Sequence, residues 1–400
     1  MVFDVARVRG LYTSLGDGWT YLNAHQIPQV PERVLSGVAA AFRTHAQMPF
    51  DDYLRSSHSS ASQPNALAQL EAARQAVADL TASPAECVVL GPNRQYLTAV
   101  LAEKLSTFVR RKAGVVLSRS DAQWFTRPFT RLDATLRWAE PDLGTGLLPG
   151  WQFNELVDGS TRLVALNAAH PLLGTVAPVA DIVETVRAKS RAWVIVDAST
   201  YAAYRPLDVE EWQADIVLLD LAELGGPQVS AMVFRDTSMF PRLSGAMPLE
   251  LGVESLPNGL LGGVPNLIHH MSVLDEESGN IHASMAALAD YQGTVTEHLI
   301  DSLKGLPAVH IIGVSGDAAG EYAAALDRVP RLSFAVRGVP AEMVHRRLMD
   351  NHLVTTVSPQ DPLLSAMGAT EAGGSITIGL GPFSTTYEVD QLTRVLASLA

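Results

Sequence analysis

The chain has 400 residues, of which 47% are hydrophobic and 18% charged, with 30 glycines and 23 prolines. This composition is typical of a soluble globular protein and excludes a disordered or collagen-like chain. The formal net charge of -13 makes nucleic acid or an anionic membrane an unfavourable partner for the surface as a whole. At about 100–200 residues per domain, we expect two domains.

The chain has one cysteine, Cys87, and no apolar run of membrane-spanning length. A single cysteine cannot form a disulfide within the chain and fits a reducing compartment. The first residues lack the basic segment followed by an apolar stretch that is typical of a secretory signal. We therefore expect a cytoplasmic protein.

Residues 1–60 are expected to form an irregular N-terminal segment. Within it, Pro31 to Arg43 predicts a helix because apolar residues recur there at helical spacing. The small polar residues from Arg55 to Ser62 predict a loop. The stretch from Gln63 to Leu80 predicts a further helix with one apolar face.

Short apolar runs then alternate with helical stretches such as Ala180–Ser190, which predicts a large α/β domain over residues 61–283. Several runs are apolar at every position, as in strands that are buried on both faces of a sheet. The predicted strands are Cys87–Leu90, Gly114–Leu117, Leu163–Leu166, Ala192–Val196, Ile216–Leu219 and Ser230–Phe234.

Residues 284–400 predict a smaller C-terminal α/β domain. A long helix from about Ser284 to Leu303 leads into it, and a second helix begins at Pro340 and ends near Asn351. A last helix follows the capping-box spacing of Thr385 to Glu388. The predicted strands are Val309–Gly313, Arg331–Val336, Leu353–Val357 and Ser375–Gly379.

Several common catalytic motifs are absent. The sequence contains no P-loop, no zinc-protease His-Glu-x-x-His and no Gly-x-Ser-x-Gly elbow. His269 and His270 are adjacent on a predicted helix, where their side chains point about 100° apart. Surface and packing roles are therefore favoured over a metal site. Cys87 opens an apolar strand and is expected to be a buried free thiol.

Two patterns indicate a ligand site. In Trp193–Thr200, Asp197 stands at the C-terminal end of a buried strand, where open α/β sheets bind ligands. Considered alone, such an aspartate is more often the cap of a turn or helix. In Asp215–Gln228, a strand ends, a Gly-Gly-Pro turn follows and another strand returns.

Together these patterns resemble the cysteine desulfurase branch of the class V aminotransferases, which are fold-type I pyridoxal-phosphate enzymes. The resemblance covers nearly the whole chain, including Tyr21–Ala24, Leu172–Val179 and Glu388–Leu392. The similarity is greatest to actinobacterial cysteine-desulfurase-like proteins that lack the cofactor lysine. It implies a mostly parallel sheet of the seven-stranded type between helices, a small C-terminal α/β domain and a homodimer.

The family's chemistry needs a lysine for the internal aldimine, an acid for the pyridine nitrogen and backbone N–H donors for the phosphate. The resemblance places the acid at Asp197, but it places Glu223 at the lysine position and Thr377 at the substrate-arginine position. The loop near Val357 to Met367 has no cysteine to accept sulfur. The other pocket positions, which the resemblance implies are vestigial cofactor contacts, are Thr200, Gly91, Asn93 and Gln123.

The loss of the lysine does not depend on the alignment. Only four of the 29 basic residues are lysines, and none lies between Lys189 and Lys304. Glutamate cannot form a Schiff base. Two acids in one pocket would raise the pKa of one of them, or the pocket would serve a cation or another ligand. In addition, Pro92 removes a backbone donor from the phosphate loop.

The sequence therefore predicts a pseudoenzyme of this family, without a covalently bound cofactor or a metal, that acts by binding a small molecule or a protein partner. The alternative is an enzyme of altered chemistry. Such an enzyme would use non-covalently bound pyridoxal or pyridoxamine phosphate, or another small ligand, in the remodelled cleft. Both alternatives stay open at the level of sequence.

Overall fold

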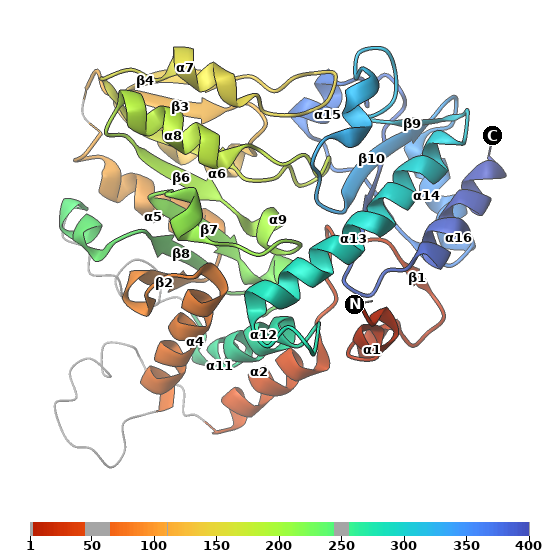
Figure 1. Ribbon diagram of the computed structural model, residues 1–400, viewed down its shortest axis with the longest axis horizontal. Coiled ribbons are helices and arrows are strands. Elements are labelled where there is room, and N and C mark those ends of the chain that lie inside the picture. The colour runs from red at the N-terminus through yellow and green to blue at the C-terminus, as the bar shows by residue number, and fades with distance from the viewer. Residues whose placement is uncertain (1–2, 45–64, 110, 244–255, 400) are drawn as a thin grey trace.

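The computed structural model describes residues 3–44, 65–109, 111–243 and 256–399 (Figure 1). A seven-stranded sheet has the strand order β2-β8-β7-β6-β5-β3-β4, in which only β8 runs antiparallel to its neighbours. Its strands are β2 (Val88–Gly91), β3 (Gly114–Ser118), β4 (Thr135–Ala139), β5 (Thr161–Asn167), β6 (Trp193–Asp197), β7 (Ile216–Asp220) and β8 (Ser230–Phe234). This is the mixed, largely parallel α/β fold predicted from the sequence.

Apolar side chains on both faces hold this sheet between helices. In β6, Val194 and Val196 join one core cluster, whereas Trp193 and Ile195 join the other, because successive residues of a strand point to opposite faces. The first face is covered by α4 (Asn65–Thr81), α8 (Val179–Lys189) and α12 (Gly263–Ser272), and the second by α5 (Arg94–Leu105) and α6 (Gln123–Thr130). The prediction of strands buried on both faces is confirmed.

An antiparallel sheet of four strands, in the order β12-β13-β10-β9, forms later in the chain. Its strands are β9 (Val309–Ile311), β10 (Arg331–Val336), β12 (Thr356–Val357) and β13 (Ile376–Gly379). Its core is shared with α13 (Ile281–Lys304), α14 (Ala341–Asp350) and α16 (Thr386–Ala397). The long helix α13 crosses the molecule between the two sheets (Figure 1).

One predicted strand is wrong. The stretch from Leu353 to Val357 is not continuous: β11 (Leu353–Val354) pairs in parallel with β1 (Thr20–Tyr21), and β12 pairs with β13. The chain therefore changes its strand partner at Thr355. The Thr355 hydroxyl lies 3.2 Å from Nδ1 of the His345 ring. The residues of β1 are thereby tied to the C-terminal part of the chain, whereas α2 (Glu32–Thr44) packs against α12.

The strand β4 was not predicted, and the predicted loop from Arg55 to Ser62 lies outside the described residues. The division of the chain into three parts stays a prediction. Among the described residues, no helix is long and apolar enough to cross a membrane, and no group of three or more metal-ligating side chains occurs. Cys87 is a buried free thiol.

Candidate functional site

Acidic side chains gather where two parallel strands end. Asp197 is the last residue of β6 and Asp220 the last residue of the neighbouring β7. Glu223 follows in the short helical turn Leu221–Leu224. Because parallel strands place their C-terminal ends along one edge of the sheet, these three carboxylates share the edge at which open α/β sheets bind ligands.

The turn after β7 fixes the direction of Glu223. The Asp220 side chain accepts a hydrogen bond from the backbone N–H of Ala222 at 3.2 Å and so starts the turn. Gly225 ends it at a φ of +83°, and a Cβ at this position would lie 2.7 Å from the carbonyl oxygen of Gln29. Only glycine fits this conformation and this contact. The Gly-Gly-Pro pattern seen in the sequence is therefore what orients Glu223.

The guanidinium group of Arg94 lies among the three carboxylates. Its Nη1 is 2.8 Å from Asp197 Oδ2, its Nη2 is 2.6 Å from Glu223 Oε1, and its Nε is 3.3 Å from Asp220 Oδ2. The two Nη groups donate hydrogen bonds to Asp197 and Glu223, whereas Nε lies close to Asp220 without a hydrogen bond. The Trp124 ring stands next to the group, with its centroid 5.0 Å from the guanidinium carbon.

The remaining oxygens of Asp197 and Glu223 are also engaged. Asp197 Oδ1 accepts from the backbone N–H of Ser199 at 3.0 Å and from its hydroxyl at 2.6 Å. Glu223 Oε2 accepts from the Thr200 hydroxyl at 3.1 Å and lies 3.3 Å from Arg331 Nη2. Asp197 therefore binds the first residue of α9 (Ser199–Ala202), whose N-cap is Ala198, and binds Arg94 as well.

Arg331 reaches the site from β10 of the four-stranded sheet. Its side chain is only 1% exposed. Besides Glu223 it contacts the Tyr204 hydroxyl at 3.1 Å and the carbonyl oxygen of Pro171 at 3.2 Å. Glu223 consequently contacts Arg94, from the start of α5 beside the seven-stranded sheet, and Arg331, from β10 of the four-stranded sheet. The three side chains form a row of ion pairs, the Arg94–Glu223–Arg331 chain.

The charges shift the pKa values of the cluster in different directions. Burial alone would raise the pKa of Glu223, but Arg94 and Arg331 outweigh burial and lower it. Burial raises the pKa of Asp220 more than Arg94 lowers it. Burial opposes the charge of Arg94, yet Asp197, Glu223 and Asp220 raise its pKa above the ordinary value. Of the two alternatives that the sequence left open, the pocket that serves a cation applies to Glu223, and the cation is Arg94 of the chain itself.

A fourth carboxyl group lies behind this cluster. Asp121 follows β3 and is buried, and its Oδ1 accepts from the backbone N–H of Asn167 at 3.1 Å. Burial raises the pKa of Asp121 well above its ordinary value, and the nearby Asp197 charge adds to this effect. Sequence reasoning missed this residue.

The structure brings together only some of the residues that the resemblance singled out. Asp197, Thr200 and Glu223 contact one another or Arg94. Gly91 and Asn93 lead directly into Arg94, and the Asn93 side chain caps α5 by accepting from the backbone N–H of Tyr96 at 2.7 Å.

The other two predicted positions lie apart from the carboxylates. Gln123 lines a cleft of about 630 Å³ whose walls come from the start of α6 and from α15 (Pro362–Ala366) with its flanking loops. Trp124 also lines this cleft, so the ring beside Arg94 borders open space. Thr377 is buried in β13 and hydrogen-bonds Ser333 and Ser358. Its hydroxyl is therefore engaged by hydrogen bonds within and beside the four-stranded sheet.

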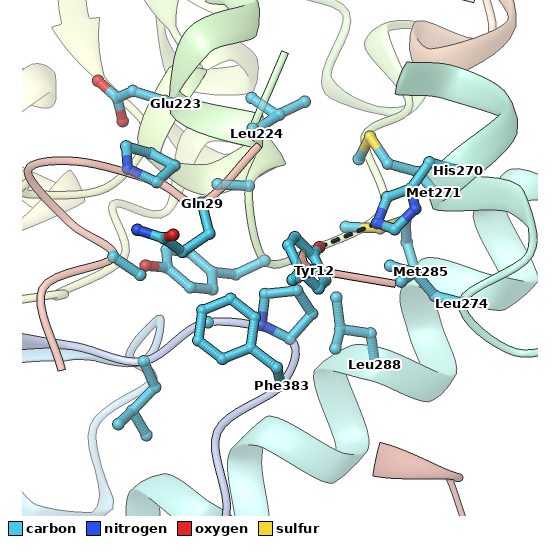
Figure 2. Close-up of a pocket in the computed structure, with 18 residues that line it drawn as sticks. Tyr12, Gln29, Glu223, Leu224, His270, Met271, Leu274, Met285, Leu288 and Phe383 are labelled. Atoms are coloured by element: carbon cyan, nitrogen blue, oxygen red, sulfur yellow. Dashed lines mark hydrogen bonds between the residues drawn. The ribbon is translucent and has the colours of Figure 1, made fainter. Parts of the chain in front are cut away.

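A second pocket is lined in part by Glu223 (Figure 2). It is lined mainly by apolar side chains, among them Met271, Leu288 and Phe383. At its far end the Tyr12 hydroxyl lies 2.9 Å from His270 Nε2. Burial is the main reason that the pKa of His270 is lowered to about 4. His270 is thus a buried packing residue that is neutral near pH 7, and His269 is exposed.

Pyridoxal phosphate, which the resemblance implies, does not fit this set of residues. The carboxylate of Asp197, which the resemblance assigns to the pyridine nitrogen, is held by Arg94, and Glu223 occupies the position that the resemblance assigns to the aldimine lysine. The described lysines are elsewhere: Lys104 lies on α5, Lys112 in a turn, and Lys189 and Lys304 at the ends of α8 and α13. At the phosphate loop, Pro92 has no N–H and Asn93 already caps the helix.

Sequence reasoning missed the arginines that complete the site. Arg94 is 103 residues from Asp197, and Arg331 is 108 residues from Glu223. No local pattern marks either of them. The one usable signal is an unneutralised pair of carboxylates at adjacent strand ends, which requires a cation from elsewhere in the chain.

Comparison with known proteins agrees with the fold. The family profile for class V aminotransferases matches residues 29–392. An uncharacterized protein of Mycobacterium tuberculosis is 38% identical over the full length of both chains. A cysteine desulfurase of Yersinia pestis is 25% identical over 258 residues, which is 61% of each chain.

Solved structures give the same result. A cysteine desulfurase from Thermococcus onnurineus has a TM-score of 0.81 at 18% identity, with 100% of this chain and 98% of that chain covered. A cysteine desulfurase from Escherichia coli has a TM-score of 0.78, also at 18% identity, with the same coverage. The profile matches over most of the chain, and the chain belongs to the class V aminotransferase family.

Proposed function

We propose that this protein is a non-catalytic member of its family that acts by binding, without the internal aldimine on which the family's chemistry depends. One observation carries the proposal. Glu223, at the lysine position, is held on both carboxylate oxygens by Arg94, Arg331 and Thr200. A side chain so engaged neither forms a Schiff base nor leaves room for one.

The electrostatics of the site support the same proposal. An active pyridoxal-phosphate site presents a carboxylate to the pyridine nitrogen and cationic or neutral donors to the phosphate. Here the carboxylates of Asp197, Asp220 and Glu223 share one guanidinium group. An additional phosphate dianion would meet acidic neighbours.

The test is a titration of the purified protein with pyridoxal phosphate, followed by borohydride reduction and peptide mapping. We expect no aldimine absorption band and no reduced adduct beyond sparse labelling of the exposed lysines. A stoichiometric adduct at one lysine would overturn the proposal. The lysines to inspect are Lys104, Lys112, Lys189 and Lys304.

The alternative of altered chemistry draws on the cleft beside Gln123 and Trp124, which is large enough for a small molecule. Calorimetry with pyridoxamine phosphate separates the two proposals. Heat of binding together with a thermal shift would favour an enzyme with a non-covalent cofactor, and their absence would favour the binding role. The homodimer implied by the resemblance belongs to the same proposal and is tested by light scattering in solution.

A further inference from the structure

We propose that a separate pocket, between the N-terminal loop and strand β1, binds the quaternary ammonium group of a small organic cation such as choline. The pocket has a volume of about 200 Å³ and shares no residue with the carboxylates around Arg94. It is lined by Ser14, Leu15, Asp17, Trp19, Tyr21, Gln29 and Val354. The inference goes beyond the proposed function, because it concerns another site and does not depend on the family's cofactor.

The start of β1 brings two aromatic rings into this pocket. Trp19 directly precedes β1 and Tyr21 ends it, and side chains two residues apart on an extended chain point to the same side. Tyr21 pairs with Val354 of β11, which adds an aliphatic side chain to the same wall. Gly18, at a φ of +77°, makes the turn that carries Asp17 into the pocket ahead of the rings.

Neighbours that do not line the pocket hold both rings in place. The Tyr21 hydroxyl donates a hydrogen bond to the carbonyl oxygen of Ile27. The Trp19 ring contacts the His352 ring, with the centroids 4.8 Å apart and the planes at 81°. Trp19 nevertheless remains 37% exposed, so part of its indole is uncovered. Aromatic surface that is fixed and uncovered attracts organic cations.

Asp17 supplies the negative charge. Among the described residues, no arginine, lysine or histidine lines the pocket, and none forms an ion pair with Asp17. This carboxylate therefore differs from Asp197 and Glu223, whose counter-charge is Arg94. A cation from solution has no such competitor at Asp17, and the net charge of -13 attracts cations to the protein as a whole.

The walls favour a methylated ammonium group over a bare one. A bare ammonium group is strongly hydrated and brings three N–H donors that need acceptors. Ser14 and Gln29 already hydrogen-bond each other at 2.5 Å, and Leu15 and Val354 are apolar. A quaternary ammonium group has no N–H and suits apolar walls, aromatic rings and one carboxylate. The pocket is also smaller than the 300–1,000 Å³ that is typical of sites for drug-sized ligands, which indicates a small molecule.

The experiment is calorimetric titration of the wild-type protein with choline and with 3,3-dimethyl-1-butanol, in which carbon replaces the charged nitrogen. We expect choline to bind with a Kd of about 1 mM or tighter, and the neutral compound to bind roughly tenfold more weakly. Ethanolamine, which is choline without its methyl groups, should also bind roughly tenfold more weakly. No binding of choline, or equal binding of either comparison compound, would overturn the proposal.

Variants locate the binding. Trp19→Leu should abolish binding of choline, and Asp17→Asn should weaken it by about threefold or more. Trp151→Leu is the matched control, because Trp151 is 64% exposed and does not line the pocket. If Trp19→Leu does not fold, Asp17→Asn still decides, since Asp17 is an exposed turn residue. Binding to Asp17→Asn or Trp19→Leu as tight as to the Trp151→Leu control would contradict the assignment.

The same head group also occurs on phosphatidylcholine, so sedimentation with phosphatidylcholine vesicles separates the two sources. We expect free choline to bind and the vesicles not to retain the protein. Retention on vesicles without binding of free choline would overturn the assignment to a small molecule.

The outcome is independent of the cofactor titration. An aldimine in that titration would overturn the proposed function and leave the choline result standing. A protein that forms no aldimine and binds no choline would keep its non-catalytic assignment and lose this ligand site.

Discussion

Replacing Glu223 with glutamine tests how far the stability of the protein depends on the Arg94–Glu223–Arg331 chain. Glutamine keeps the size and shape of glutamate but removes its charge. Both ends of the side chain face N–H donors, since Arg94 Nη2 lies at one oxygen and Arg331 Nη2 at the other. Whichever way the amide turns, its NH₂ group meets a guanidinium group.

The magnitude follows from the burial of the partners. Arg94 keeps Asp197 and Asp220, but Arg331, 1% exposed, loses the only carboxylate that it contacts among the described residues. Breaking a buried ion pair on one side costs about 3–5 kcal/mol. Because the Glu223 side chain is 16% exposed, we take the lower end, about 3 kcal/mol, or roughly a hundredfold in the unfolding equilibrium.

Urea unfolding followed by circular dichroism measures this loss, provided that the slope with denaturant stays unchanged. Glu140→Gln is the matched control, because Glu140 is 65% exposed and pairs only loosely with Arg119 at 3.5 Å. We expect about 0.5 kcal/mol or less for the control. A Glu223→Gln variant as stable as the control would refute the reasoning.

The stability of the wild type and that of Glu223→Gln should also depend differently on pH in the acid range. Arg94 and Arg331 hold the pKa of Glu223 below its ordinary value despite burial. A carboxyl group with a lower pKa in the folded state contributes stability above its unfolded pKa, about 4.3, and loses it as the pH falls through the folded value. The stability gap between wild type and Glu223→Gln should therefore be full at pH 6 and shrink below pH 4.

Three other predictions follow from the same structure. Glu223→Lys should yield no aldimine absorption with pyridoxal phosphate and should lower the melting temperature, because its ammonium group enters beside two guanidinium groups. His270, whose pKa is lowered to about 4, is neutral when folded but protonates near pH 6.5 when unfolded, so wild type should lose stability from pH 6.5 to 4. His270→Gln should flatten that slope in melting curves, and an unchanged slope would contradict this origin. Gly174→Ala should destabilise by more than about 1 kcal/mol in urea unfolding, because φ is +72° and the new Cβ would lie 2.3 Å from a backbone oxygen. Gly159→Ala, with open space around it, is the control and should change little.

The fold could be predicted from the sequence because most strands of the large sheet are apolar on both faces. In β6 and β7 nearly every position is buried, which leaves a continuous apolar run. The edge strand β4 escaped detection because Thr135 is exposed and Arg137 stands within it. The break at Thr355 was invisible for another reason: a change of strand partner depends on tertiary contacts and leaves no local pattern.

The candidate site was predictable only in part. Asp197 and Glu223 follow strands whose ends the pattern located, and the lysine gap could be counted directly. Arg94 and Arg331 could not be placed at the site, because their carboxylate partners are about a hundred residues away along the chain. The sequence also contains 25 arginines, and no pattern indicates which of them neutralise these carboxylates. The sequence therefore showed what the pocket lacks, and the structure shows which side chain fills it.

The three-way contact of Arg94 also bears on how this branch of the family can change. A single substitution that returns lysine to position 223 would leave Arg94 in place and crowd cations together. A single substitution that removes Arg94 would strand three carboxylates without their counter-charge. Either first step passes through a less stable protein, so an aldimine lysine at position 223 requires coupled changes at both positions.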